Sequence, residues 1–217
     1  AEMAKIFENI FRAVNIALVN ETNEIAEKLN IDFHEVLDLC KTKPFGFMEF
    51  RPGPGVGGHC IPVDPFYLSW LAKKKGLPTE FINLAGLING NKPKIVSKKI
   101  KNIFKQNKIK NEDSIIVLGV SYKKNIADLR NSPAKIIFEI LEKKFKNIEY
   151  FDPYVSQIKV NKKIYKSIKK FNFEITKYKA VILLTDHEDF KKIKFNIEKT
   201  LVVDCKNFFK NEKVFKL

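Results

Sequence analysis

The sequence is poor in cysteine and in long apolar runs. Its 217 residues contain three cysteines, at positions 40, 60 and 205, and this odd, widely spaced set matches neither a disulfide framework nor a zinc or iron–sulfur spacing. The longest apolar runs, such as 115–119, have the length of a strand and are too short to cross a membrane. We therefore expect a soluble protein of a reducing compartment, the cytoplasm, without a bound metal or a membrane partner.

Arginine is also scarce, although the chain is strongly basic. The formal net charge is +15, from 40 Lys and Arg against 25 Asp and Glu, yet only three of the basic residues are arginines. The lysines are spread between apolar residues, as on solvated helix faces, whereas recognition of nucleic-acid phosphates and bases favours clustered arginine. This distribution argues against nucleic acid as a partner and leaves an anionic small molecule as the more natural ligand.

The first half of the chain has the apolar spacing of helices. Residues 2–28 repeat at helical period without a breaker, which predicts one long helix. Asp32 has the position of an N-cap before a short helix that ends near Lys41. Further helices are expected over 64–75, closed by a glycine, and over 79–106.

After residue 107 the pattern changes to short, buried, β-branched runs. These predicted strands alternate with helical or loop segments, an order that favours a parallel α/β sheet with right-handed crossovers. The strands are expected at 114–119, 148–151, 180–185 and 201–203, with a helix that begins at Ser132-Pro133. We therefore predict an all-helical domain over 1–107 and a Rossmann-like α/β domain over 108–217.

One glycine- and proline-rich loop carries the strongest chemical signal. Residues 52–65 hold four of the nine glycines and four of the nine prolines, placed around Cys60, with Asp64 four residues later. Glycine lets the backbone approach a ligand, and proline fixes the chain. A free cysteine is more often a small buried apolar residue. In this rigid frame, however, a thiolate nucleophile is the favoured interpretation of Cys60.

Other polar residues suggest additional roles. Lys5 and Asn9 are four residues apart on one predicted helix face, where they would suit a developing oxyanion or would simply be solvated. Lys123 and Arg130 follow the first strand of the α/β part, the position where such sheets bind phosphates. His187 follows a strand, and we interpret it as a structural helix-start residue rather than the partner of Cys60 in a hydrolase dyad.

These motifs together resemble the nucleotide-sugar 6-dehydrogenases, the UDP-glucose/GDP-mannose dehydrogenase family. The loop Gly-Val-Gly-Gly-His-Cys-Ile-Pro-Val-Asp-Pro is similar to its catalytic cysteine signature, and Glu2-x-x-Lys5-x-x-x-Asn9 to the start of its central helical domain. The C-terminal part of the resemblance is carried by Tyr122-Lys123, Asp128-x-Arg130-x-Ser132-Pro133, Thr185-Asp-His187 and Asp204-Cys-Lys206-Asn207. The resemblance extends over essentially the whole chain.

The resemblance implies a covalent oxidation of a sugar alcohol to an acid. Cys60 would form a thiohemiacetal and then a thioester, Lys5 and Asn9 would hold the oxyanion, and Asp64 would position or activate water. NAD would be the oxidant and would be bound mainly by an N-terminal Rossmann domain, because Gly-x-Gly-x-x-Gly does not occur in this sequence. We therefore expect a fragment of a longer enzyme that is inactive by itself.

The resemblance also implies a substrate and an assembly. The backbone of Gly57, with Lys123 and Lys206, would bind a UDP-sugar; Phe50 and Arg51 would line the same site, and Arg130 would be on the cofactor side. Lys206 stands where many members carry arginine, which weakens a bidentate phosphate contact. A homodimer or a higher homo-oligomer through the long first helix is expected.

The substrate itself stays open at this point. The segments Thr42–Phe47 and Asp64–Leu68 are most similar to the UDP-N-acetylglucosamine 6-dehydrogenase branch, with UDP-glucose and UDP-N-acetylmannosamine as alternatives. A different class of function, a stand-alone module for UDP binding or oligomerisation, is the non-enzymatic alternative.

Overall fold

The computed structural model describes residues 2–168, 174–175, 177–195, 199–211 and 213–217. It forms two compact units, Ala1–Lys92 and Pro93–Leu217. The first is helical and the second contains a parallel sheet, so the predicted fold class is confirmed. The division falls at Pro93, inside helix α4 (Glu80–Gln106), whereas the sequence prediction assigned this whole helix to the first domain.

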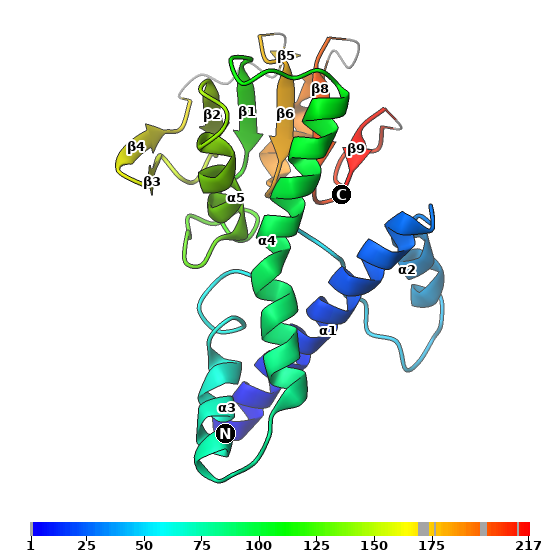
Figure 1. The fold of residues 1–217 in the computed structure, drawn as a ribbon. Helices are drawn as coiled ribbons and strands as arrows, with labels where there is room; N and C mark the ends of the chain where they lie inside the picture. Colours follow the sequence, from blue (N-terminus) through cyan, green and yellow to red (C-terminus); the bar gives the residue numbers. More distant parts are fainter. Residues whose placement is uncertain (1, 169–173, 176, 196–198, 212) are drawn as a thin grey trace. The chain divides into compact units, whose positions relative to one another are not determined.

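The first unit contains three further helices: α1 (Glu2–Lys28), α2 (Phe33–Lys41) and α3 (Asp64–Lys74). The long first helix packs against both α2 and α3 (Figure 1). All three begin and end within a residue or two of the predicted bounds, because their capping residues are local signals.

Two caps show why these local predictions succeed. The Asp32 side chain accepts the backbone N–H groups of His34 at 2.9 Å and Glu35 at 3.3 Å, which satisfies two donors at the start of α2. Gly76, at φ +73°, follows the end of α3, and Leu77 N donates to Ala72 O at 3.0 Å. This is the left-handed glycine cap that ends many helices.

The glycine- and proline-rich loop is tied to α1 by a buried asparagine. Asn20, only 1% exposed, accepts the backbone N–H of Gly53 at 3.1 Å through its Oδ1. Its Nδ2 donates to Asn89 Oδ1 on α4 at 3.4 Å. Asn20 therefore connects two helices and fixes the beginning of the loop that carries Cys60.

The second unit is built on a five-stranded parallel sheet in the order β2-β1-β6-β8-β9. Its strands are β1 (Ile115–Leu118), β2 (Ile148–Phe151), β6 (Ala180–Leu183), β8 (Leu201–Asp204) and β9 (Phe215–Lys216). The chain runs from β1 through α5 (Pro133–Glu142) to β2, and later places β6 on the other side of β1. All strands stay parallel, but the side of the sheet to which the chain adds the next strand changes at the boundary between β1 and β6.

Both faces of this sheet are covered. On one face, α5 and the C-terminal half of α4 cover the sheet (Figure 1). Ile115 and Val117 of β1 pack there with Ile137 of α5 and with Ile100 and Phe104 of α4. On the other face, the alternate strand residues pack against the short helix η1 (Glu188–Lys192). Burial on both faces explains why the central strands β1 and β6 are continuous apolar runs in the sequence.

Several small elements were not predicted. They are the antiparallel pair β3 (Gln157–Val160) and β4 (Lys163–Lys166), and the short parallel pair β5 (Glu174–Ile175) and β7 (Lys194–Phe195). These strands have only two to four residues each, which is too short for a periodic pattern to identify them. Among the described residues, no helix combines the length and the apolar character that crossing a membrane requires.

Candidate functional site

Cys60 lies in the turn that leads into α3. Its carbonyl oxygen accepts the backbone N–H groups of Val63 at 3.1 Å and Asp64 at 2.8 Å, so the cysteine begins the first helical turn. Pro65 occupies the next position in the helix, where its missing N–H costs nothing. The Cys60 side chain is exposed and accessible to a substrate.

Asn9 and Asp64, two of the predicted catalytic residues, are brought together. Asn9 Nδ2 on α1 donates to Asp64 Oδ2 on α3 at 2.9 Å, although the residues are far apart in the sequence. The Asn9 side chain is buried, and the contact fixes one carboxylate oxygen of Asp64. Lys5 lies one turn before Asn9 and is exposed, and its oxyanion role stays a prediction.

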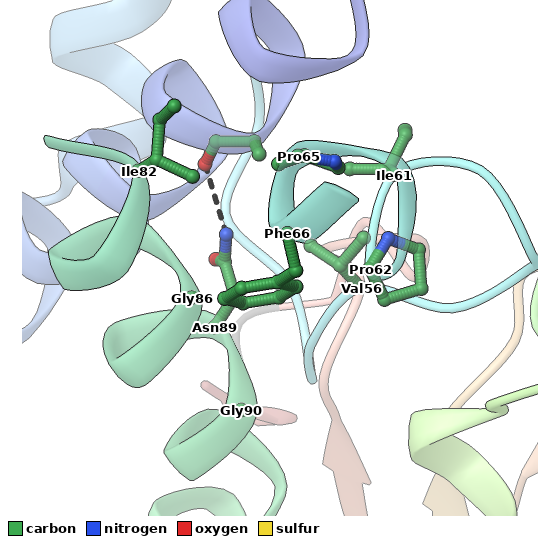
Figure 2. A pocket seen from close by; sticks show the side chains of 10 residues that line it. Val56, Ile61, Pro62, Pro65, Phe66, Ile82, Gly86, Asn89 and Gly90 are labelled. Atoms are coloured by element: carbon green, nitrogen blue, oxygen red, sulfur yellow. Dashed lines mark hydrogen bonds between the residues drawn. The ribbon is translucent and has the colours of Figure 1, made fainter. Parts of the chain in front are cut away.

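A small apolar pocket of about 200 Å³ lies behind the cysteine loop (Figure 2). Its walls come from the loop, α3, α1 and α4, with Ala13, Val56, Ile61, Pro62, Pro65, Phe66, Ile82, Gly86, Asn89 and Gly90. The Phe66 ring lies against Gly86, where an added Cβ would be 2.3 Å from Phe66 Cζ. The volume is below the usual ligand range of about 300–1,000 Å³, so this space is packing beneath the site.

Phe50 and Arg51 have different surroundings. Phe50 lines an open groove of about 690 Å³ on α1 together with Phe7, Phe11 and Met48. The Arg51 guanidinium contacts Asp38, and its Nε donates to Glu49 Oε1 at 2.5 Å. Hydrogen bonds from Lys41 and Arg51 hold the pKa of Glu49 below its usual value. Arg51 is thus already paired with two carboxylates.

The candidate residues of the second unit follow the carboxyl ends of its strands. Lys123 is exposed in the loop after β1. Lys206 follows β8, and its Nζ is 3.8 Å from Asp186 Oδ1, which follows β6. Arg130 is paired with Asp128 through three guanidinium hydrogen bonds of 2.6–3.1 Å. Ligands of parallel sheets bind at this edge, where Lys123 is exposed and Lys206 has a longer, looser contact with a carboxylate than Arg130 has.

The same edge contains a buried polar network that sequence reasoning missed. His187 is fully buried, and its Nε2 lies 3.1 Å from Asp152 Oδ2. The Asp152 carboxylate also accepts the backbone N–H groups of Val120 at 2.8 Å and Ser121 at 3.1 Å. Burial raises the pKa of Asp152, but its hydrogen bonds outweigh burial and hold that pKa below the usual value. Asp152-Pro153 ends the predicted strand over 148–151, and this place at a strand end is the one signal that could have drawn attention to Asp152.

The bonding of His187 assigns its tautomer. Asn125 N donates to His187 Nδ1 at 2.9 Å, so Nδ1 carries no proton and Nε2–H faces Asp152. The imidazole is therefore neutral, and both nitrogens are occupied within the second unit. His187 is also the N-cap of η1, as expected for a helix-start residue. A Cys60–His187 dyad has no support in this arrangement.

The helical unit, the cysteine loop and the α/β unit define the class of protein. The central-domain model of the UDP-glucose/GDP-mannose dehydrogenase family matches residues 1–91, and the UDP binding domain model of the same family matches residues 116–211. The chain belongs to this family, and the resemblance inferred from its motifs is confirmed.

Individual relatives show the same pattern. The chain is 33% identical to a UDP-N-acetyl-D-mannosamine dehydrogenase of Methanocaldococcus jannaschii over 98% of this chain and 48% of that protein. It is 37% identical to a UDP-N-acetyl-D-glucosamine 6-dehydrogenase of Salmonella typhi over 89% of this chain and 45% of that protein. The chain thus spans about half the length of the curated relatives it matches.

A solved structure agrees with the fold. That of a UDP-D-ManNAc dehydrogenase from Pyrococcus horikoshii aligns with a TM-score of 0.81 at 32% identity, over 97% of this chain and 49% of the other. A UDP-glucose dehydrogenase from Pyrobaculum islandicum, only 19% identical, has a TM-score of 0.80 and shows the fold alone.

Proposed function

We propose that this chain is the C-terminal portion of an NAD-dependent nucleotide-sugar 6-dehydrogenase that oxidises the C6 alcohol of a UDP-sugar to a uronate. The observation that carries the proposal is the hydrogen bond of 2.9 Å between Asn9 and Asp64, one turn after an exposed Cys60, in a chain of this family. The nucleophile, a polar donor and a carboxylate are thereby placed in one unit.

Cys60 supplies the covalent step. The C6 alcohol first loses a hydride and its hydroxyl proton to give the aldehyde. The Cys60 sulfur adds to this aldehyde, with transfer of the thiol proton to the oxygen, to give a thiohemiacetal. Loss of a second hydride from that carbon and of the hydroxyl proton gives a thioester. Water then adds, the carbon–sulfur bond breaks, and the thiol is restored with release of the acid. Lys5 and Asn9 stabilise the oxyanion, and Asp64 orients the water. NAD, when bound to the parent protein, accepts the two hydrides.

The sugar is proposed to be a UDP-N-acetylhexosamine. The sequence segments beside the site favour UDP-N-acetylglucosamine. Relatives named for UDP-N-acetyl-D-mannosamine, such as the Methanocaldococcus jannaschii protein, support its 2-epimer as the second candidate. The diphosphate is held by Lys123 and Lys206. The guanidinium groups of Arg51 and Arg130 are hydrogen-bonded to carboxylates at 3.0 Å or less, whereas Lys206 has only a contact of 3.8 Å with Asp186.

The covalent step is tested in the full-length protein. Cys60→Ala and Cys60→Ser are expected to abolish uronate formation from a UDP-sugar and NAD. Cys40→Ala is the matched control, since Cys40 is also an exposed thiol but lies on α2. Uronate formation at an undiminished rate in Cys60→Ala contradicts the mechanism.

UDP binding is tested on the 217-residue chain by calorimetry with UDP, UDP-N-acetylglucosamine, UDP-N-acetylmannosamine and UDP-glucose. We expect UDP to bind, and Lys123→Ala or Lys206→Ala to weaken it by about tenfold or more, because a hydrogen bond to a charged group contributes roughly 1.5–3 kcal/mol. The chain alone should show no turnover with NAD. Turnover by the isolated chain, or an absence of UDP binding, contradicts this division of roles.

A homodimer through α1 completes the proposal. The exposed residues Met3, Phe7, Phe11, Leu18 and Ile25 form one stripe along this helix. Apolar exposure on this scale is typical of an interface. The stand-alone binding module remains the alternative, and reading the coding sequence upstream for Gly-x-Gly-x-x-Gly distinguishes the two.

A further inference from the structure

Three side chains of the types that bind transition metals converge at the start of α3. His59, Cys60 and Asp64 each offer one ligand atom, and these three atoms lie within 4.8 Å of one another. The cysteine spacing of the sequence excluded zinc sites made mainly of cysteine. From that spacing we expected no bound metal at all, although the spacing does not test a mixed site with one nitrogen, one sulfur and one oxygen ligand.

The backbone prepares this arrangement. The bond of 2.8 Å from Asp64 N to Cys60 O closes a helical turn, so the two side chains, four residues apart, lie on one face. Gly58 has a φ of +85°, a conformation that favours glycine, and it turns the chain just before His59. The three ligands are thus positioned by backbone geometry that needs no metal.

The ligand set and its spacing suit Zn²⁺. Zinc binds thiolate sulfur, imidazole nitrogen and carboxylate oxygen at about 2.0–2.3 Å in a tetrahedral geometry, which separates the ligand atoms by roughly 3.3–3.8 Å. The ligand atoms, which lie within 4.8 Å of one another, can reach this spacing by rotation of the exposed side chains of His59 and Cys60. A thiolate and an imidazole select zinc over magnesium and calcium.

Asp64 is also oriented from outside the cluster. Asn9 Nδ2 donates to Asp64 Oδ2, which leaves Oδ1 as the oxygen available to a metal. Hydrogen bonds of this kind hold a metal ligand in place and raise the affinity of metal sites. The same contact therefore supports a water-orienting role and a ligand role for Asp64.

We propose that His59, Cys60 and Asp64 form a Zn²⁺ site with an open fourth position, and that zinc and substrate compete for the Cys60 sulfur. Binding forms a sulfur–zinc bond and releases the thiol proton to solvent, so zinc affinity falls as the pH falls. Inhibition of turnover by zinc rests on the proposed function. The binding itself does not, and it stands if the dehydrogenase mechanism fails.

The test titrates Zn²⁺ into the untagged, reduced chain in competition with a chromophoric chelator, and Co²⁺ into a parallel sample. We expect one zinc per chain and, with cobalt, the thiolate charge-transfer absorption of a tetrahedral site. Residues that only orient ligands contribute about 10–100-fold to metal affinity. His59→Ala, Cys60→Ser and Asp64→Asn, which remove ligands, should each weaken zinc binding by at least about tenfold.

Cys40→Ser is the matched control, because this exposed thiol lies outside the only such cluster found in the described part of the chain. Its zinc affinity should equal that of the unchanged protein. The proposal is overturned if only Cys60→Ser weakens binding, since a single thiol would then hold the metal, or if Cys40→Ser weakens it as much. Circular dichroism of each variant confirms that a lost affinity does not come from unfolding.

Discussion

Gly119 is the residue at which a single methyl group should do the most damage to the α/β unit. It follows β1 with a φ of +77°, a left-handed conformation that residues with a Cβ adopt at a cost. An added Cβ would lie 2.5 Å from Thr185 Cβ, 2.7 Å from Thr185 O and 3.0 Å from Thr185 Cα. Because two of these atoms belong to the backbone, the contact is not relieved by rotating a side chain.

The size of the effect follows from two additive costs. The left-handed conformation costs a non-glycine residue roughly 1–2 kcal/mol. Overpacking a closely packed site costs about 1–3 kcal/mol. Gly119→Ala should therefore lower the free energy of unfolding of the second unit by about 2–5 kcal/mol. Gly76 has a φ of +73° with nothing within 4 Å of an added Cβ, so Gly76→Ala should cost the first unit only the strain.

Hydrogen exchange measured by mass spectrometry separates the two units. Amides of β1 and β6 should exchange at least about 30-fold faster in Gly119→Ala, because about 1.4 kcal/mol corresponds to a factor of ten. Asparagine tolerates the left-handed region, so Gly76→Asn should be nearly neutral. Because asparagine also carries a Cβ, Gly119→Asn should still strongly destabilise the second unit. The reasoning is refuted if Gly119→Ala lowers the free energy of unfolding of the second unit by no more than Gly76→Ala lowers that of the first unit.

Three further predictions concern the polar anchors and the exposed face of α1. The lowered pKa of Asp152 means that folding favours the ionised form of this carboxyl group. The ionised group contributes its full stabilisation above the pKa of about 3.9 that it has in the unfolded chain. That stabilisation is lost as the pH falls through the lower pKa of the folded protein. Acid titration of Asp152→Asn, followed by circular dichroism, should lack this loss and start from a stability lower by at least roughly 1–3 kcal/mol. Asn20→Ala leaves Gly53 N without its buried acceptor, so amide exchange over residues 52–65 should accelerate, and unchanged exchange there speaks against the anchor. Phe11→Asp should convert a dimer to a monomer in sedimentation, whereas Lys28→Asp on the same helix should not.

Local signals account for most of what could be predicted. The N-cap of Asp32 and the glycine cap at Gly76 depend on neighbours a few residues away, so the helix ends could be located from the sequence. The apolar runs that form β1 and β6 have to be buried on both faces of the sheet. This requirement led to the correct prediction of a parallel sheet. The boundary of the units was less accessible, because α4 continues through Pro93 and packs its C-terminal half in the second unit.

The candidate site, too, could be predicted only in part from the sequence. The glycines and prolines around Cys60 led to the prediction of a nucleophile, because rigidity and close approach are properties of the residues themselves. The pairing of Arg51 with Asp38 and Glu49, and of Arg130 with Asp128, changes which cations are available for a diphosphate. The sequence placed these charges near the site without indicating their partners.

The sequence by itself determined the fold class, the family and the chemical identity of the cysteine loop, since these depend on residue type, period and short-range order. The tertiary structure decided which distant groups meet. It joined Asn9 to Asp64 and buried His187 as a partner of Asp152. Contacts of this kind depend on how helices and strands pack, and the spacing of residues along the chain carries no record of them.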